Sequence, residues 1–204
     1  MIYDVSMLIH PSMQVYKNKE EKKPRFETIA SHPNDGAHET NVTMNLHTGT
    51  HIDYPLHMIE NGKTSDNEIL DTLIGPCKVI DLTSVKHNIS KFDLEPYTIT
   101  DNDFLLLKTR NSFSDVFLSD FVYLDESGAR YLNSKNIRGV GIDGLGIERA
   151  QPAHPTHKIL LSEDIIIIEG LRLKDIREGT YELYCLPLKM QGVEAVPARV
   201  ILKD

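Results

Sequence analysis

The chain has 204 residues, of which 40% are hydrophobic and 25% are charged, with 12 Gly and 10 Pro. This composition excludes collagen-like, low-complexity and disordered chains. The formal net charge is -8 at pH 7, and Lys and Arg are dispersed along the sequence, which argues against nucleic acid as the main partner. No apolar stretch approaches the roughly 20 residues of a membrane span, and the N-terminus lacks a basic segment followed by an apolar run. We therefore expect a cytoplasmic protein with no membrane partner.

The chain length and pattern predict one domain over residues 1–204. A chain of this size buries roughly 70% of its unfolded surface, which is enough for a single core. No repeat of 20 to 50 residues and no Pro-rich or Ser-rich linker divides the sequence.

The first part of the chain predicts a loop, then a strand that breaks into a tight turn. The basic run over 17–25 alternates with Glu20 and Glu21, which indicates a solvated loop. A strand is predicted over 41–46. The segment after this strand is predicted to be a tight turn and not a helix, because Gly49, its β-branched neighbours and Pro55 all disfavour the interior of a helix.

The remaining elements indicate a mixed α plus β architecture. Strands are predicted over 78–82, 104–108, 139–142, 165–169 and 181–188. The run of four isoleucines at 165–168 is typical of a central strand that is buried on both faces. Helices are predicted over 68–73, ended by Gly75-Pro76, and over 126–135.

One short segment gathers the residues that carry chemistry. The run His47-Thr48-Gly49-Thr50-His51-Ile52-Asp53-Tyr54-Pro55-Leu56-His57 holds three imidazoles and a carboxylate, although the whole chain has only 9 His. Zinc and manganese prefer nitrogen and oxygen ligands of this kind. If the local chain is extended, His51 and Asp53 share one side of it. The sequence therefore predicts a metal site here.

A catalytic metal needs ligands from more than one segment, because a single loop does not hold an open coordination position in a shaped cavity. The best second segment contains His154 and His157 and ends at Glu169. Glu169 closes the apolar isoleucine strand, and a carboxylate at that place is costly to bury unless a positive charge neutralises it. A metal ion would do so.

These residues resemble the cyclase-like metal-dependent hydrolases, a family that includes bacterial kynurenine formamidase (arylformamidase) and isatin hydrolase. The specific part is the eleven-residue segment, which is similar to the family's His-x-Gly-Thr-His-x-Asp-x-Pro-x-His signature. Weaker similarities extend over most of the chain. They are Asp4-Val5-Ser6, Met13-Gln14-Val15-Tyr16, Val140-Gly141-Ile142-Asp143, Leu186-Pro187-Leu188-Lys189 and Pro197-Ala198-Arg199.

The resemblance implies a swivelling β/β/α-type fold with a mixed, barrel-like central sheet. It also implies one or two zinc ions, with manganese as the alternative. His47, His51 and Asp53 would hold one ion, and Asp53, His157 and Glu169 would hold a second. The family carries a histidine about a dozen residues before this glutamate, a spacing that favours His157 over His154. A homodimer or homotetramer is implied as well.

The implied reaction is hydrolysis of the C–N amide bond of a small aryl-formamide by metal-activated water. In the resembling family the last histidine of the signature, here His57, exchanges protons, and its ordinary pKa near 6.5 suits that role. No Gly-x-Ser-x-Gly elbow is present to supply a serine nucleophile.

Several alternatives remain open. The chain has Lys17 and Asn18 where the family usually has proline and glycine, glycines at 144–146 where a serine is common, and no Trp. A cyclic amide such as isatin is therefore an alternative substrate. A non-haem iron oxygenase also uses two His and one carboxylate, although a second carboxylate and an extra base argue against it. A closed structural metal site would need four tightly spaced ligands.

Overall fold

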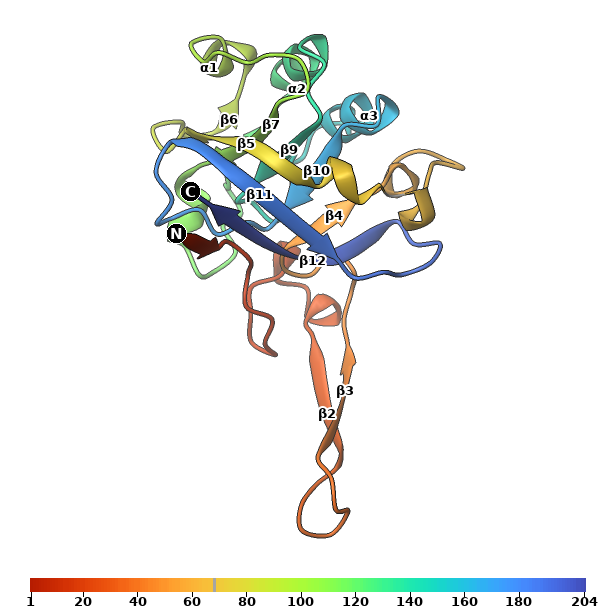
Figure 1. The fold of residues 1–204 in the computed structure, drawn as a ribbon. Coiled ribbons are helices and arrows are strands. Elements are labelled where there is room, and N and C mark those ends of the chain that lie inside the picture. Colours follow the sequence, from red (N-terminus) through yellow and green to blue (C-terminus); the bar gives the residue numbers. More distant parts are fainter. Residues whose placement is uncertain (68) are drawn as a thin grey trace.

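The structure is a computed structural model that describes residues 1–67 and 69–204. Its main feature is one large mixed sheet, with three α-helices in the described residues packed on one side (Figure 1). The strands of this sheet are β1 (Ile2–Asp4), β4 (His51–Asp53), β5 (Ile74–Asp81), β7 (Phe104–Lys108), β9 (Gly139–Ile142), β10 (Ile166–Glu169), β11 (Gly179–Pro187) and β12 (Ala195–Lys203).

The sheet closes on itself. Its strand order is β1-β12-β11-β5-β7-β9-β10-β4, and β4 pairs in turn with β12. The first residues of β12 pair with β4 and its last residues pair with β1, so both short strands share one edge of β12. Strands β5, β7, β9 and β10 run parallel, and the other pairs in the sheet are antiparallel. The predicted α+β class with a mixed, barrel-like sheet is thus confirmed.

Two apolar cores follow from the alternation of side chains along the strands. In β7, Phe104 and Leu106 pack inside the closed sheet, whereas Leu105 and Leu107 pack outside it against the helices. The helices that cover the outer face are α1 (Lys91–Leu94), α2 (Glu126–Ser134) and α3 (Pro155–Ser162) (Figure 1). Because both faces are covered, the parallel strands are apolar at nearly every position. A small parallel pair, β6 (Asn88–Ile89) and β8 (Tyr123–Leu124), lies beside α1 and α2.

The structure confirms several predicted elements. The strands over 104–108 and 139–142 match β7 and β9, and the isoleucine run forms β10 between β9 and β4. The helix predicted over 68–73 is wrong in its described part, where Leu70–Thr72 is a 3-10 turn; Glu68 lies outside the described residues. Gly75 does not end a helix but pairs with Leu183, inside the sheet, at φ +135°. The other 3-10 turns in the described part of the chain are Tyr16–Asn18, Glu20–Lys22, Pro55–His57, Ser65–Asn67 and Arg110–Phe113.

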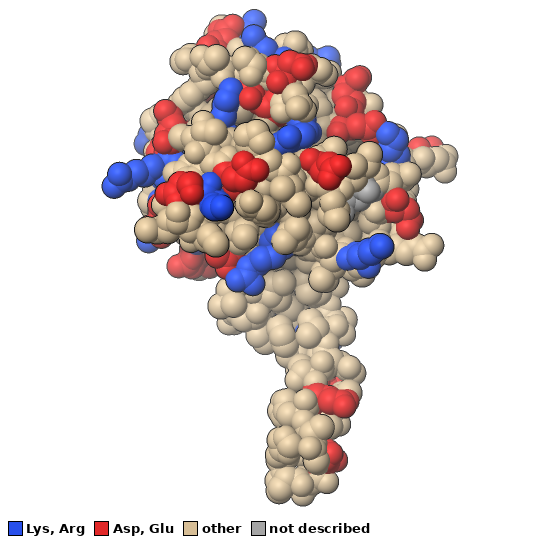
Figure 2. Space-filling view, viewed as in Figure 1, with Lys and Arg blue, Asp and Glu red and all other residues tan. Residues whose placement is uncertain are grey.

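A two-stranded arm projects from the body. It consists of β2 (Arg25–Ala30) and β3 (Glu39–Thr43), which form an antiparallel hairpin (Figures 1 and 2). Strand β2 was not predicted, and the strand predicted over 41–46 ends at Thr43. The arm leads directly into the turn that contains His47.

No helix in the described residues has the length and apolar character to cross a bilayer.

Candidate metal centre and active site

The two predicted site segments meet along a pair of neighbouring strands. Strands β4 and β10 are antiparallel, and His51 lies opposite Glu169. Because β4 is extended, His51 and Asp53 point to its outer side, while Ile52 points into the core inside the sheet. The side chains at 51, 53 and 169 therefore project from adjacent strands toward one place.

Two glycines allow this close approach. Gly49 and Gly170 both have positive φ angles, +75° and +71°, which favour glycine. A Cβ atom at Gly170 would collide with the Gly49 carbonyl group. The Thr50 hydroxyl donates a hydrogen bond of 2.6 Å to the Gly170 carbonyl oxygen, which joins the turn before β4 to the turn after β10.

Asp53 lies at the centre of the site. Its carboxylate is fully buried, and neither oxygen has a hydrogen-bond partner with suitable geometry. Its closest neighbours are three imidazoles: Oδ1 lies 3.0 Å from His47 Nδ1 and 3.3 Å from His51 Nε2, and Oδ2 lies 3.6 Å from His157 Nε2. Burial alone would raise the pKa of Asp53, but these imidazoles lower it well below its usual value.

The orientation of His51 follows from its backbone. Its Nδ1 lies 2.9 Å from the Gly49 carbonyl oxygen, which can only accept, so Nδ1 carries the proton of that hydrogen bond. The lone pair of Nε2 in the neutral ring is then left for the site, where it faces Asp53 and Glu169. Without a metal ion, burial lowers the pKa of His51, but the Asp53 carboxylate outweighs this effect and raises the pKa to about 9.

Glu169 and His157 complete the buried cluster from the second segment. Glu169 is 4% exposed, and one of its oxygens accepts a hydrogen bond of 2.6 Å from the Ile147 backbone N–H. His157 lies on α3, and its Nε2 is 3.3 Å from Glu169 Oε1. Burial lowers the pKa of His157, but Asp53, Glu148 and Glu169 together raise it well above its usual value.

His154 lies outside this cluster. Its Nδ1 is 2.5 Å from Glu148 Oε1, and its side chain is 55% exposed. Of the two histidines that the sequence offered, His157 is therefore the one that faces Asp53 and Glu169. Neither α3 nor the contact of Glu148 with these histidines was predicted. Pro155 at the first turn of α3 was the available signal for the helix, because proline is favoured there.

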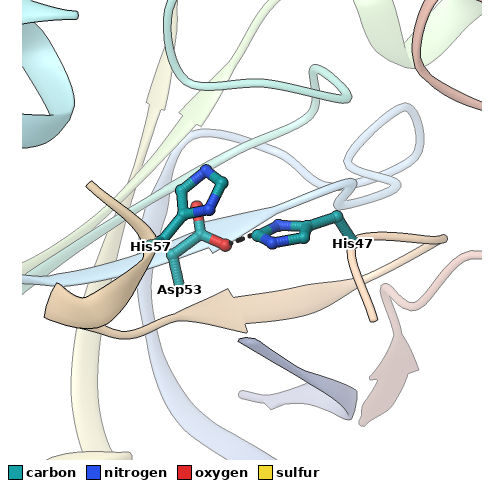
Figure 3. Close-up of side chains that lie close together, drawn as sticks. All are labelled: His47, Asp53 and His57. Carbon is teal, nitrogen blue, oxygen red and sulfur yellow. Dashed lines mark ion pairs between the residues drawn. The ribbon is translucent and has the colours of Figure 1, made fainter. Parts of the chain in front are cut away.

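His47 and His57 form the side of the site that is nearest to solvent. Both are half-buried, and their ring centroids are 4.2 Å apart. Figure 3 shows both rings beside the carboxylate of Asp53. Burial lowers the pKa of His57, so the neutral ring is favoured at neutral pH. His57 is close enough to His47 and Asp53 for the three to share an ion, so its role as a base stays a prediction.

The donor set fits a divalent cation. It consists of imidazole nitrogens and carboxylate oxygens, and the fully buried Asp53 carboxylate lacks hydrogen bonds. A buried charge in this state is costly unless it is paired or coordinates a metal. Ligand atoms of His51, Asp53 and Glu169 lie within 4.8 Å of one another, as do those of His47, Asp53 and His57. Asp53 belongs to both groups.

The closed sheet and this donor set are those of a metal-dependent hydrolase. A family model described as "Putative cyclase" matches residues 3–149. The chain belongs to this cyclase family, as the resemblance of the sequence implied.

Relatives of known sequence cover nearly the whole chain. Kynurenine formamidase from Erythrobacter litoralis (strain HTCC2594) is 32% identical over 100% of this chain and 94% of its own length. Cyclase-like protein 1 from Arabidopsis thaliana is 31% identical over 98% of this chain and 84% of its own length.

Solved structures agree with the fold. The structure of a predicted metal-dependent hydrolase from Bacillus stearothermophilus is 52% identical, with a TM-score of 0.91 over 99% of this chain and 97% of that one. Isatin hydrolase A from Labrenzia aggregata, bound to benzyl benzoate, is 23% identical, with a TM-score of 0.87 over 99% of this chain and 93% of that one. At 23% identity, the similarity to isatin hydrolase A is evidence for the fold alone.

Proposed function

We propose that the protein hydrolyses the C–N amide bond of a small aryl-formamide with a bound divalent metal, zinc or manganese. The observation that carries this proposal is the buried Asp53 carboxylate, which has imidazoles and a second carboxylate around it and His57 at its solvent side. The relatives named kynurenine formamidase support the substrate class, since they match along the whole chain at about 30% identity.

We assign the metal ligands as the family resemblance implies. His47, His51 and Asp53 would hold one ion, and Asp53, His157 and Glu169 would hold a second where two ions bind. When bound, a divalent ion would lower the pKa of its water toward about 7 and would polarise a carbonyl oxygen of the substrate. The chain itself holds the ligands at fixed positions, because His51, Asp53 and Glu169 project from paired strands.

His57 is the proton-transfer residue in this proposal. Burial lowers its pKa, so its ring is free to accept a proton near neutral pH. Its position at the solvent side lets it take a proton from the attacking water and return it to the leaving amine. No side-chain nucleophile is then required.

The test joins metal analysis to substrate assays. Protein purified without chelator is analysed for zinc, manganese and iron, and is assayed on N-formylkynurenine, isatin and formanilide. We expect one or two divalent ions per chain and hydrolysis of a formamide. Turnover of isatin but no formamide would show that the cyclic amide is the substrate class. Oxygen consumption would indicate an iron oxygenase, and a metal bound without open coordination would indicate a structural site.

We also propose that the active form is a homodimer or homotetramer. The arm formed by β2 and β3 supports this, because Phe26, Ile29 and Val42 are 45%, 51% and 50% exposed on it. Phe26 lies opposite Val42 in the hairpin, and apolar side chains that are exposed next to one another mark contact surfaces. Light scattering coupled to gel filtration measures the mass in solution, and a monomer at micromolar concentration would contradict the proposal.

A further inference from the structure

Glu148 is a buried carboxylate behind the candidate metal ligands. It is 4% exposed and follows the glycine-rich segment after β9. One oxygen, Oε1, lies 2.5 Å from His154 Nδ1. The other, Oε2, accepts a hydrogen bond of 3.2 Å from the His157 backbone N–H and lies 3.5 Å from His157 Nδ1. None of the sequence motifs drew attention to this residue.

The ring of His157 lies between two groups of carboxylates. Its Nε2 faces Glu169 and Asp53, at 3.3 and 3.6 Å. Its Nδ1 is buried and lacks a hydrogen bond of good geometry, and Glu148 Oε2 is the carboxylate oxygen that lies near it. A carboxylate can only accept, so without a cation a protonated Nε2 donates to Glu169 Oε1, at 3.3 Å. In the neutral, metal-binding form of the ring, a proton kept on Nδ1 points toward Glu148 and leaves the lone pair of Nε2 for a cation beside Asp53 and Glu169.

We propose that Glu148 is a positioning residue that fixes the tautomer and ring orientation of His157 for metal binding. This rests on the proposed metal-dependent function. Metal-binding histidines in general donate their second ring N–H to a carboxylate or a carbonyl group, which orients the ring and makes it a stronger ligand. A small rotation of the ring would shorten the 3.5 Å separation to a hydrogen bond.

Two neighbours hold Glu148 in place. His154 covers one oxygen from the solvent side, and it has a left-handed backbone, with φ at +53°, directly before α3. Gln151 Nε2 lies 3.5 Å from Glu148 Oε2 and donates a hydrogen bond of 2.7 Å to the Thr156 hydroxyl. His154 therefore has a place beside the site, close to Glu148 and His157, although it does not face Asp53 or Glu169.

A purely structural role for Glu148 makes a different prediction. Its bond to the His157 backbone N–H satisfies a donor in the first turn of α3, and loss of that bond would lower the stability of the fold. Such a loss would not change metal affinity in protein that remains folded. The affinity of the folded protein for metal thus separates the two roles.

The decisive variant is Glu148→Gln, which keeps the size of the side chain and an oxygen for the backbone N–H but removes the charge. Zn²⁺ and Mn²⁺ alone are titrated into chelator-treated protein, and the melting temperature of the metal-free form is measured beside it. We expect metal affinity to fall by about 10–100-fold, with a small change in melting temperature. The matched control is Glu163→Gln, because Glu163 is exposed and lies just after α3. We expect this control to bind metal with the affinity of the wild type.

Each other outcome has a definite meaning. If the wild type binds metal and Glu148→Gln binds it equally well, the charge of Glu148 is not required, and Glu148→Ala, which also removes the acceptor for Nδ1–H, decides. Unchanged metal affinity in folded Glu148→Ala overturns the positioning role while the proposed function stands. If the wild type binds no metal, the proposed function fails and this inference fails with it. If Glu148→Gln does not fold, His154→Ala is tested in its place. It removes the outer partner of the carboxylate and is expected to weaken metal binding, and unchanged affinity in that variant overturns the proposal.

Discussion

His51 and Glu169 lie opposite each other on antiparallel strands, with His51 Nε2 3.5 Å from Glu169 Oε2. The backbone register of β4 and β10 sets this relationship. The other edge of β4 pairs with β12, where His51 lies opposite Pro197. Strand β10 is likewise paired on both edges, with β9 and β4. His51 and Glu169 therefore project from two strands that are each held on both sides, which is the rigid support that a catalytic metal requires.

Replacement of Asp53 by asparagine should empty the site. The neutral amide cannot balance the charge of the cation, and the three imidazoles that face Asp53 would no longer share a carboxylate. We expect metal affinity to fall by more than the ~10–100-fold that loss of an outer partner costs, and hydrolysis to fall to background. Metal content and activity are measured on the same preparation. Asp71→Asn, an exposed change outside the cluster, should behave as the wild type; retained metal in Asp53→Asn would contradict the assignment.

The His57→Ala variant should separate chemistry from metal binding. Its ring lies beside His47 at the solvent side of the site, and we assign it proton transfer rather than coordination. Loss of a general acid–base group lowers turnover by about 10²–10⁴-fold. We expect kcat to fall in this range while the metal content stays at the wild-type value. A variant that arrives without metal would show that His57 is a ligand with His47 and Asp53.

Much of this cluster could be predicted from the sequence, because most of its candidate ligands lie in one short segment and at the end of one strongly apolar strand. His47, His51 and Asp53 are close in the chain, so the signature alone brought them together. Glu169 was identifiable because a carboxylate that ends a buried isoleucine strand needs a compensating charge. The structure adds the register that aligns the two segments, which depends on pairing between strands far apart in the chain.

Other parts of the structure could not be predicted from the local sequence. Strand β2, which was not predicted, and strand β3, whose first two residues lie outside the strand predicted over 41–46, are exposed along nearly their whole length, so no alternation of apolar and polar residues marks them. Strand β12 contains Pro197, a residue that argues against a strand in the interior of a sheet. Glu148 resembles any other charged residue after a turn, and only the packing of α3 shows what it contacts.

Metal affinity should rise with pH. Without metal, the Asp53 carboxylate raises the pKa of His51 to about 9, against the effect of burial, so the ring carries an extra proton at neutral pH. A cation can bind His51 only after that proton leaves. We expect affinity to increase by about tenfold per pH unit for one displaced proton, up to about pH 9. Titration of Mn²⁺ at pH 6, 7 and 8 measures it, and an affinity that does not change with pH would contradict the assignment of His51 as a ligand.

The stability of the metal-free protein should fall as the pH rises, whereas metal affinity should increase. The folded-state pKa of His51 lies above its unfolded value of 6.5, so its protonated form stabilises the fold. This contribution is fully present below pH 6.5 and is lost as the pH rises through about 9. Chelator-treated protein should therefore lose thermal stability between these values. A His51→Gln variant should lose less over the same range, and an equal loss in both proteins would assign the effect to another group.

Gly170 allows the turn after β10 to lie against the turn before β4, so Gly170→Ala should separate them. The added Cβ would collide with the Gly49 carbonyl group and would lie 3.3 Å from the Thr50 Cα atom. The positive φ of +71° adds a cost of about 1 kcal/mol for a residue with a side chain. We expect a loss of unfolding free energy of roughly 2–4 kcal/mol, together with weaker metal binding, because Glu169 directly precedes the displaced residue.

Gly36 supplies the matched control for that change. It lies in the turn between β2 and β3 with a φ of +68°, and a Cβ atom there would meet nothing within 4 Å. Gly36→Ala therefore carries the same backbone strain without the collision. We expect it to lose only about 1 kcal/mol and to keep wild-type metal affinity, as measured by urea unfolding and metal titration. Equal losses in the two variants would show that backbone strain, rather than the contact between the two turns, limits the site.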